Sequence, residues 1–365
     1  MRLPPELSVE IIRGSQTSTG AYPASPAHEV YRYGWLRDGS WCAQAMDRAG
    51  HRASAGAWHR WVAEVLLRHE RRVEEALDAA RGGTIDGRVM LPARFTLEGE
   101  EEAAGGEEWP NFQLDCYGHW LWAVADHVER GGELESPMEA AARLVIRYLM
   151  GAAQLACYDC WEEHPGQRHT STLASVVAGL RDAGSLLGDR DAQAYAGTLR
   201  GQMLGPDHTL GGSLVRSVGD TRVDGSLVWV FIPYRIVPLD ADLAATTIGR
   251  VRDELQLTSG GVRRYQGDTF FGGAEWILLA ASLGCVSVAQ GDNRLAEGLL
   301  NWIEGTATAD GFLPEQVTDN VQSPHMLRYW QQRWGQTACP LLWSHAMHLI
   351  LLDDLGRLSP CRATG

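Results

Sequence analysis

The chain has 365 residues, of which 45% are hydrophobic and 21% charged, and this composition excludes a largely disordered protein. Its formal net charge of -14 at pH 7 would be repelled by phosphate backbones and anionic lipid, so nucleic acid and membrane surfaces are poor partners. No apolar run approaches the roughly 18 residues of a membrane span, and no secretory signal is evident. We therefore expect a soluble, cytoplasmic protein.

Apolar residues recur with helical spacing along most of the chain, and alternating strand patterns are nearly absent. Pro137 suits a first helical turn, and Thr170 or Ser171 and Asn293 can cap the helices that follow them. The pattern predicts an all-α fold of about twelve helices in a single domain over residues 1–365. The predicted helices cover residues 6–17, 38–50, 54–80, 112–131, 137–155, 170–187, 189–204, 225–238, 242–256, 274–290, 293–307 and 339–357.

The links between these helices alternate in length. Those after the second, fourth, sixth, eighth and tenth helices have about two to five residues, as in tight αα-hairpins. The other links are long, and loops of more than about 12 residues inside a compact domain are usually functional. In an antiparallel series of helices, all the long links fall at the same end, so we expect a functional site there. The long links are residues 18–37, 81–111, 156–169, 205–224, 257–273 and 308–338.

The seven cysteines are an odd number scattered over the chain, which favours reduced thiols over a disulfide framework. Cys157 and Cys160 form a lone C-x-x-C without the further ligands of a tetrahedral zinc site. The sequence has no H-E-x-x-H metal motif, no phosphate-binding P-loop and no G-x-S-x-G nucleophile motif. It therefore predicts neither a metal nor a cofactor.

The first long link ends on a set of residues suited to a sugar. Arg37 and Asp38 follow Trp35, and a guanidinium beside a carboxylate can bind vicinal hydroxyls. The same pair could equally form a salt bridge at the start of a helix. Spacing alone does not choose between these interpretations.

The third long link concentrates carboxylates beside aromatic rings. Glu162 and Glu163 follow Trp161, close after Asp159. A carboxyl group next to an apolar ring loses hydration and has its pKa raised, which suits a general acid. A solvated acidic loop is the ordinary alternative, since most glutamates are exposed.

Two later links repeat this chemistry. Arg264, Tyr265, Asp268 and Trp276 supply a guanidinium, an acceptor and flat faces on which a sugar can stack. Glu315 places a further carboxylate in the last long link. Taken alone, Glu315 is as easily structural, but two carboxylates at one end of a helical array are what glycoside hydrolysis requires.

An ordered set of motifs resembles the glucoamylase-like exo-α-glucosidases of glycoside hydrolase family 15. Each motif is weak by itself, but their order along nearly the whole chain is specific. The set comprises AYPASP at 21–26, YGWLRD at 33–38, NFQLDCYG at 111–118, WEE at 161–163, GVRRYQGDTFFGG at 261–273 with Trp276, LPEQ at 313–316 and LWSHA at 342–346.

The resemblance implies an (α/α)6 barrel of the six-hairpin glycosidase type. It implies that Glu162 is the general acid and Glu315 the general base of an inverting reaction, in which the carboxyl groups lie roughly 6.5–9.5 Å apart. Glu163 would lie near the leaving sugar. The residues implied to hold the terminal glucose are Arg37, Asp38, Arg264 and Asp115.

Two departures from the family's pattern bear on the substrate. Relatives commonly carry a β-sandwich domain before the barrel, whereas this sequence starts almost at the first predicted barrel helix, and Glu275 stands where relatives often have Pro. We therefore expect short α-glucosides, with isomaltose ahead of maltose or trehalose. Alternatives are a glucoamylase, a trehalase, a phosphorylase on a related barrel, and a catalytically silent regulatory barrel. The presence of both Glu162 and Glu315 argues against the last two.

Overall fold

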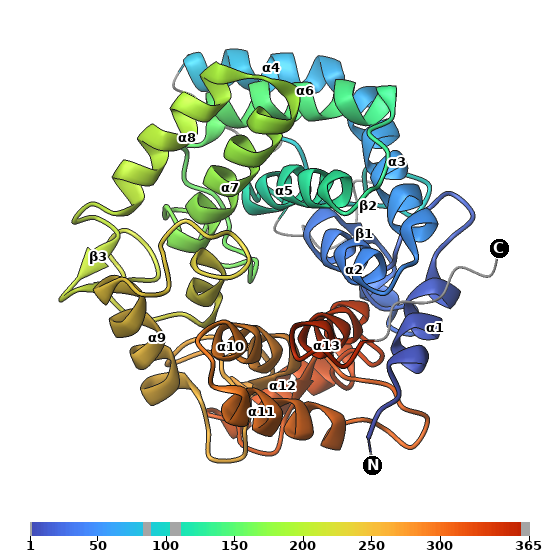
Figure 1. Cartoon of the computed structure of the whole chain (residues 1–365), viewed down its shortest axis with the longest axis vertical. Helices are drawn as coiled ribbons and strands as arrows, with labels where there is room; N and C mark the ends of the chain where they lie inside the picture. Colours follow the sequence, from blue (N-terminus) through green and yellow to red (C-terminus); the bar gives the residue numbers. More distant parts are fainter. Residues whose placement is uncertain (1, 83–88, 103–110, 359–365) are drawn as a thin grey trace.

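The computed structural model describes residues 2–82, 89–102 and 111–358, and in these ranges helices form two concentric rings (Figure 1). Part of the predicted link 81–111 and Cys361 lie outside the described residues. No helix of the described part is long and apolar enough to cross a membrane. Two rings of paired helices confirm the predicted (α/α)6 barrel.

The inner ring contains five α-helices and one short 3-10 helix, and each element packs against its two neighbours until the ring closes. Its helices are buried on nearly every side, which explains why the sequence of α10 is apolar throughout. In ring order the elements are α2 (Leu36–Arg48), α5 (Asp115–Glu129), α7 (Thr170–Leu187), η2 (Gly225–Val230), α10 (Ile277–Ala289) and α13 (Leu342–Asp354).

The outer ring consists of amphipathic helices, whose buried residues recur at three- and four-residue spacing on the side facing the inner ring. α3 and α4 are separate helices on either side of His69, where a single helix over 54–80 was predicted. The outer helices are α1 (Pro5–Ser15), α3 (Arg52–Arg68), α4 (Glu70–Arg81), α6 (Ser136–Ala152), α8 (Arg190–Met203), α9 (Asp242–Leu255) and α11 (Asn293–Gly305).

Close helix packing inside the ring depends on small residues. A Cβ on Gly179 of α7 would lie 2.2 Å from the carbonyl oxygen of Gly118 on α5, so only glycine allows the two backbones to approach this closely. The interior itself is filled by aromatic rings. Trp41 contacts one imidazole and three indoles, with ring centroids 4.5–6.2 Å apart. These partners are His119, Trp122, Trp229 and Trp343.

All six long links run from an outer helix to the amino end of an inner element, so they gather at one end of the barrel, as predicted. Three antiparallel pairs of very short strands stabilise them. They are β1 (Gly34–Trp35) with β2 (Arg94–Phe95), β3 (Thr209–Leu210) with β4 (Ser213–Leu214), and β5 (Glu275–Trp276) with β6 (Gln316–Val317). Two shorter 3-10 turns, η1 (Glu29–Tyr31) and η3 (Phe270–Gly272), also lie in these links.

Two further predictions about the helices were wrong. The helix predicted over 225–238 ends at Val230, and residues 231–241 form a longer connection than the short link expected before α9. Pro233 and Pro238 lack the N–H that a continuing helix needs. The last long link, predicted as a loop, contains the helix α12 (Pro324–Trp334), which packs on η3 and has no buried residue.

Candidate active site

A pocket of about 350 Å³ opens among the long links, above the amino ends of the inner elements. This volume is at the small end of the roughly 300–1,000 Å³ typical of ligand sites. Aromatic rings make up much of its wall. Its lining contains nine of the twelve residues predicted from the sequence: Trp35, Arg37, Asp38, Trp161, Glu162, Glu163, Arg264, Trp276 and Glu315.

Glu162 is held at the pocket by two hydrogen bonds to one of its oxygens. The indole Nε1 of Trp35 donates to Glu162 Oε1 at 2.7 Å, and Gln113 Nε2 donates to the same oxygen at 2.8 Å. Two donors at Oε1 favour a proton on Oε2 whenever this carboxyl is neutral, because an oxygen that accepts two N–H groups is a poor place for a hydrogen. The arrangement therefore suits a proton donor of fixed orientation.

The turn that carries Glu162 is built on the carboxylate of Asp159. One oxygen of Asp159 accepts hydrogen bonds from the backbone N–H groups of Trp161 and Glu163, at 3.0 and 2.9 Å. Glu162 itself has a φ of 67°, an uncommon conformation for a residue other than glycine. Backbone strain of this kind persists only where the surroundings enforce it, and here it aims the side chain into the pocket.

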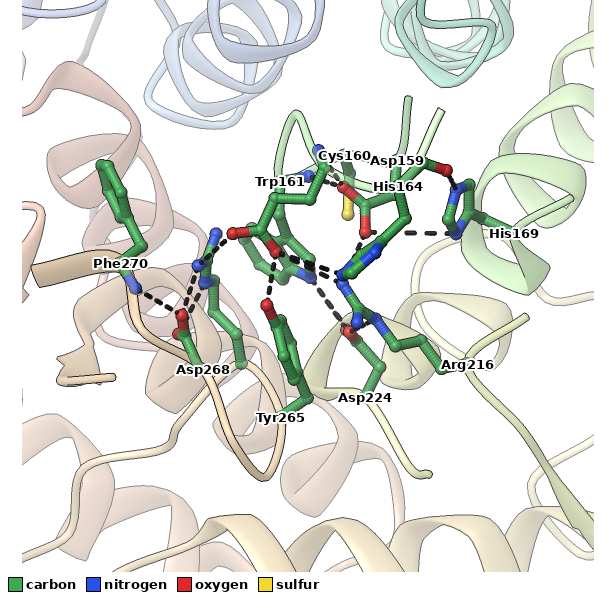
Figure 2. Close-up of polar contacts among 12 residues, drawn as sticks. Asp159, Cys160, Trp161, His164, His169, Arg216, Asp224, Tyr265, Asp268 and Phe270 are labelled. Atoms are coloured by element: carbon green, nitrogen blue, oxygen red, sulfur yellow. Dashed lines mark hydrogen bonds and ion pairs between the residues drawn. The ribbon is translucent and has the colours of Figure 1, made fainter. Parts of the chain in front are cut away.

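Arg216 anchors this turn from below. It is buried, and it pairs with Asp159 at 2.8 Å, with Glu163 at 3.4 Å and with Asp224 at 3.2 Å. Figure 2 shows Arg216 and Asp224 close together beneath the turn, with Tyr265 beside them. The guanidinium carbon of Arg216 lies 3.6 Å from the ring centroid of Tyr265. Because breaking such a buried cluster leaves charges unpaired, the turn is rigidly placed.

Glu163, next to Glu162, stays a carboxylate. Burial alone would raise the pKa of Glu163, but Arg264, a hydrogen bond from the hydroxyl of Tyr265, and Arg216 together lower it below its usual value. Arg264 Nη2 is 3.0 Å from Glu163 and pairs on its other side with Asp268. Tyr265 and Asp268 do not line the pocket but support the residues that do.

Arg264 is also enclosed by rings. Its guanidinium carbon lies 5.4 Å from the ring of Trp161 and 5.3 Å from that of Trp276. The indole N–H of Trp276 is buried without a hydrogen-bond partner. A polar group of this kind, beside a charged guanidinium at a pocket wall, is available to a polar ligand.

Arg37 and Asp38 form a second set of charged residues in the pocket wall. Arg37 Nη1 pairs with Asp115 at 3.1 Å and donates a hydrogen bond to Gln113 Oε1 at 2.8 Å. Asp38 Oδ2 lies 3.5 Å from Arg37 Nε, and neither atom makes a hydrogen bond. Burial raises the pKa of Asp38 to about 7 despite Arg37. Asp115 lies behind Arg37, outside the lining.

Glu315 faces the pocket from the link before α13. Its Oε1 accepts a hydrogen bond from the hydroxyl of Tyr31 at 3.1 Å, and its Oε2 accepts one from Gln316 Nε2 at 3.0 Å. Burial raises the pKa of Glu315 to about 7, and these hydrogen bonds and Arg264 only partly oppose the rise. The pairing of Trp276 with Gln316 in the β5–β6 ladder fixes the backbone next to Glu315.

The mouth of the pocket is aromatic and comes largely from α12. Trp330, Arg333 and Trp334 line it together with Phe270 of η3. The rings of Trp330 and Trp334 are 4.8 Å apart, and that of Phe270 lies 5.1 Å from Trp330. This wall was not predicted, although the tryptophans were visible in the last long link.

Other residues at the site also escaped the sequence analysis. Tyr31 and Gln113 lie within or next to motifs that the sequence presents, but hydroxyl and amide side chains are too common to single out. Arg216 and Asp224 lie in the long link 205–224, which carries no recognisable motif. Only the folded chain brings these four side chains to the two glutamates and their turn.

At the opposite end of the barrel, Asp47, His59 and His127 form a buried group whose possible ligand atoms lie within 4.8 Å of one another. Asp47 Oδ2 and His127 Nδ1 are 2.8 Å apart, so the carboxylate already has a hydrogen-bonding partner there. These residues sit on α2, α3 and α5, away from the pocket.

A helical double ring with two glutamates in one small, aromatic pocket is the architecture of a glycoside hydrolase. The sequence model of glycosyl hydrolases family 15 matches residues 8–265. The isomaltose glucohydrolase of Kribbella flavida is 42% identical over 357 residues, which cover 96% of this chain and 92% of that protein. The chain therefore belongs to family 15 of the glycosyl hydrolases, as its motifs predicted.

Solved structures agree in fold. A glycosidase in complex with glucose is 40% identical, with a TM-score of 0.92, and the match covers 97% of this chain and 96% of that one. A bacterial glucoamylase complexed with acarbose has a TM-score of 0.73 at 20% identity, covering 95% of this chain and 54% of that one. At this lower identity the likeness concerns the barrel alone.

Proposed function

We propose that the chain is an inverting exo-α-glucosidase that releases glucose from the non-reducing end of short α-glucosides, with isomaltose favoured. The observation that carries this proposal is a small pocket with Glu162 and Glu315 both in its wall and aromatic rings packed behind it. Trp343 lines the pocket and packs on Trp41, which fills the barrel behind it. A pocket with rings packed behind it accepts the end of a chain and excludes its middle.

In this mechanism Glu162 protonates the glycosidic oxygen. The donors Trp35 and Gln113 keep its Oε1 as the acceptor, so the proton leaves from Oε2. The bond between the anomeric carbon and that oxygen breaks, and the leaving sugar departs as an alcohol. Glu162 is left as a carboxylate, which the same two N–H donors stabilise.

Glu315 acts as the general base. It takes a proton from a water that attacks the anomeric carbon from the opposite face, which inverts the configuration there. Tyr31 and Gln316 each donate a hydrogen bond to it and fix its orientation. A base works best when its pKa is near the operating pH, and burial brings the pKa of Glu315 to about 7.

We assign the remaining predicted residues to sugar binding. Asp38 Oδ2 and Arg37 Nε, which make no hydrogen bond, would accept from and donate to hydroxyls of the terminal glucose. Arg264 would donate to the same ring, and Trp35, Trp161 and Trp276 offer faces on which it can stack. Glu163, which remains ionised, would lie near the leaving sugar. Asp115, Tyr265 and Asp268 act through the arginines and the glutamate that they bind.

The preference for isomaltose rests on the similarity to a protein named isomaltose glucohydrolase. We expect a panel of α-linked glucose disaccharides to show the highest kcat/KM for the α-1,6 linkage, with maltose and trehalose below it. Released glucose is the readout, and ¹H NMR of the first product gives its anomeric form. A higher kcat/KM on maltose or trehalose would identify a glucoamylase or a trehalase instead, and initial α-glucose would contradict inversion.

The pKa of Glu315 predicts an acidic limit to activity. A general base must be ionised, so kcat/KM should fall about tenfold per pH unit as the pH drops below about 7. Gln316→Met removes a hydrogen bond that lowers the pKa of Glu315, so the acidic limb should move to higher pH. A limb that stays in place would assign it to another group, such as Asp38, whose pKa is also about 7.

The cellular location, the reactants and the single-domain organisation are also part of this proposal. The six described cysteines are unpaired thiols, as is usual in a reducing compartment, which supports a cytoplasmic location. The reactants are the α-glucoside and water, with no metal or cofactor, and the net charge of -14 argues against nucleic acid as a partner. We propose one catalytic domain over residues 1–365. Cell fractionation with an antibody to the native protein would test its location.

A further inference from the structure

The short segment that carries Glu315 is held by two side chains of α13. The N–H of Leu313 donates to His345 Nε2 at 3.0 Å, and the hydroxyl of Ser344 donates to the carbonyl oxygen of Pro314 at 2.7 Å. Both side chains are fully buried. They lie in the first turn of α13, so the helix positions the segment through them.

The other backbone groups of this segment bind backbone partners. Glu315 N–H donates to the carbonyl of Ala338 at 2.8 Å, and Leu341 N–H donates to the carbonyl of Leu313 at 3.0 Å. The carbonyl of Glu315 accepts from Ile277 N–H at 3.4 Å. Because Pro314 has no N–H, every backbone donor and acceptor from Leu313 to Glu315 has a partner. The contacts from His345 and Ser344 are the part that a side-chain substitution can remove.

His345 belongs to a chain of hydrogen bonds whose direction is fixed. Leu313 N–H can only donate, so His345 Nε2 accepts, and the hydrogen of the neutral ring must be on Nδ1. Burial lowers the pKa of His345 to about 3, so the ring is neutral. Nδ1 then donates to Ser8 Oγ at 2.9 Å, and Ser8 donates to His348 Nδ1 at 3.0 Å. His348 Nε2 faces Glu304 at 3.6 Å.

Leu313 and Ser8 give His345 a single tautomer and a single orientation. Ser8 comes from α1, so an outer helix holds the ring that meets Leu313. No water can replace His345, because none of its surface is exposed. A displacement of the ring would therefore be transmitted to the backbone two residues before Glu315.

We propose that Ser344 and His345 are positioning residues for the general base: they set the location of Glu315 through the backbone of Pro314 and Leu313. The proposal rests on the proposed function, in which Glu315 activates the attacking water. The residues touch no substrate. Ser344 and His345 affect the reaction rate through the position of the Glu315 carboxylate, since a displacement of about 1 Å at a reacting group can cost about 100-fold in rate.

The test compares substitutions at His345 and His348. His345→Leu removes the acceptor for Leu313, whereas His345→Gln keeps an acceptor on a side chain of similar reach. His348→Leu breaks the same buried chain one step farther from Glu315. The steady-state kcat and KM for isomaltose and the thermal unfolding of each full-length variant are measured. Ser344→Ala is a second, smaller change should His345→Leu fail to fold.

We expect kcat to fall about 10- to 100-fold in His345→Leu, with KM near the wild-type value, and to recover substantially in His345→Gln. Ser344→Ala should lower kcat less. His348→Leu should lower the melting temperature while leaving kcat unchanged. Equal kcat values in His345→Leu and His348→Leu, or an unchanged kcat in Ser344→Ala, would show that these contacts serve stability alone. Glu315→Gln in the same assay separates the two proposals, because its failure to reduce turnover would refute the base assignment itself.

Discussion

Glu315→Gln is expected to lower kcat for isomaltose by about 100- to 10,000-fold, the usual contribution of general acid–base catalysis. A glutamine cannot take a proton from the attacking water. Its carbonyl can still accept the hydrogen bond that Tyr31 donates to Glu315, so the side chain should keep its place. The loss should therefore appear in kcat, with little change in KM. Steady-state kinetics with glucose release as readout measure it.

The fold of this variant should be as stable as the wild type. Burial raises the pKa of Glu315 because the charged form is poorly solvated, and a neutral amide avoids that cost. Thermal unfolding checks this point. Glu304→Gln is a matched control, since it changes a buried glutamate on the outer helix α11 and should leave turnover unchanged. Near-wild-type turnover in Glu315→Gln would remove the base assignment.

Glu162→Gln is expected to cause a loss of similar size on isomaltose, but a much smaller one on α-glucosyl fluoride. Isomaltose needs a proton on its glycosidic oxygen, and the amide cannot supply it. Fluoride departs without protonation, so the acid is dispensable for that substrate. Trp35 and Gln113 can still donate to the carbonyl of the new side chain. Parallel kcat/KM measurements on the two substrates give the comparison.

The same pair of substrates separates the two glutamates. Glu315→Gln should be slow on both, because water must be activated whichever group leaves. An equal loss on isomaltose and on the fluoride in Glu162→Gln would mean that this residue is not the proton donor. If the two variants exchanged behaviours, the roles of the glutamates would be reversed.

The barrel could be predicted from the sequence because its signals are local. Helical periodicity, capping residues and the alternation of short and long links each depend on neighbours in the chain, and α7 begins and ends where they predict. The eighth predicted helix, over 225–238, was too long because apolar residues there continue past Pro233, and periodicity does not register a missing N–H. α12 was missed because its polar and aromatic residues pack on η3 and leave no buried stripe.

The site was predictable where chemistry and motif coincide in one short stretch. All twelve predicted residues lie in the pocket wall or directly behind it. Partners from distant links were not predictable, since Tyr31 is 284 positions from Glu315 and Gln113 is 49 from Glu162. The pKa of Glu315 also depends on burial that only the folded chain creates.

The aromatic filling of the barrel has a kinetic consequence. Since Trp343 lines the pocket and packs on Trp41 behind it, we expect glucose formed there to leave by the mouth through which the substrate came. The leaving sugar would lie between this glucose and the solvent, so it has to depart first. Each turnover therefore ends with both products released and the substrate free of the protein. Such an enzyme is distributive, shortening many molecules by one sugar each, and free glucose competes with its substrate for the same end of the pocket.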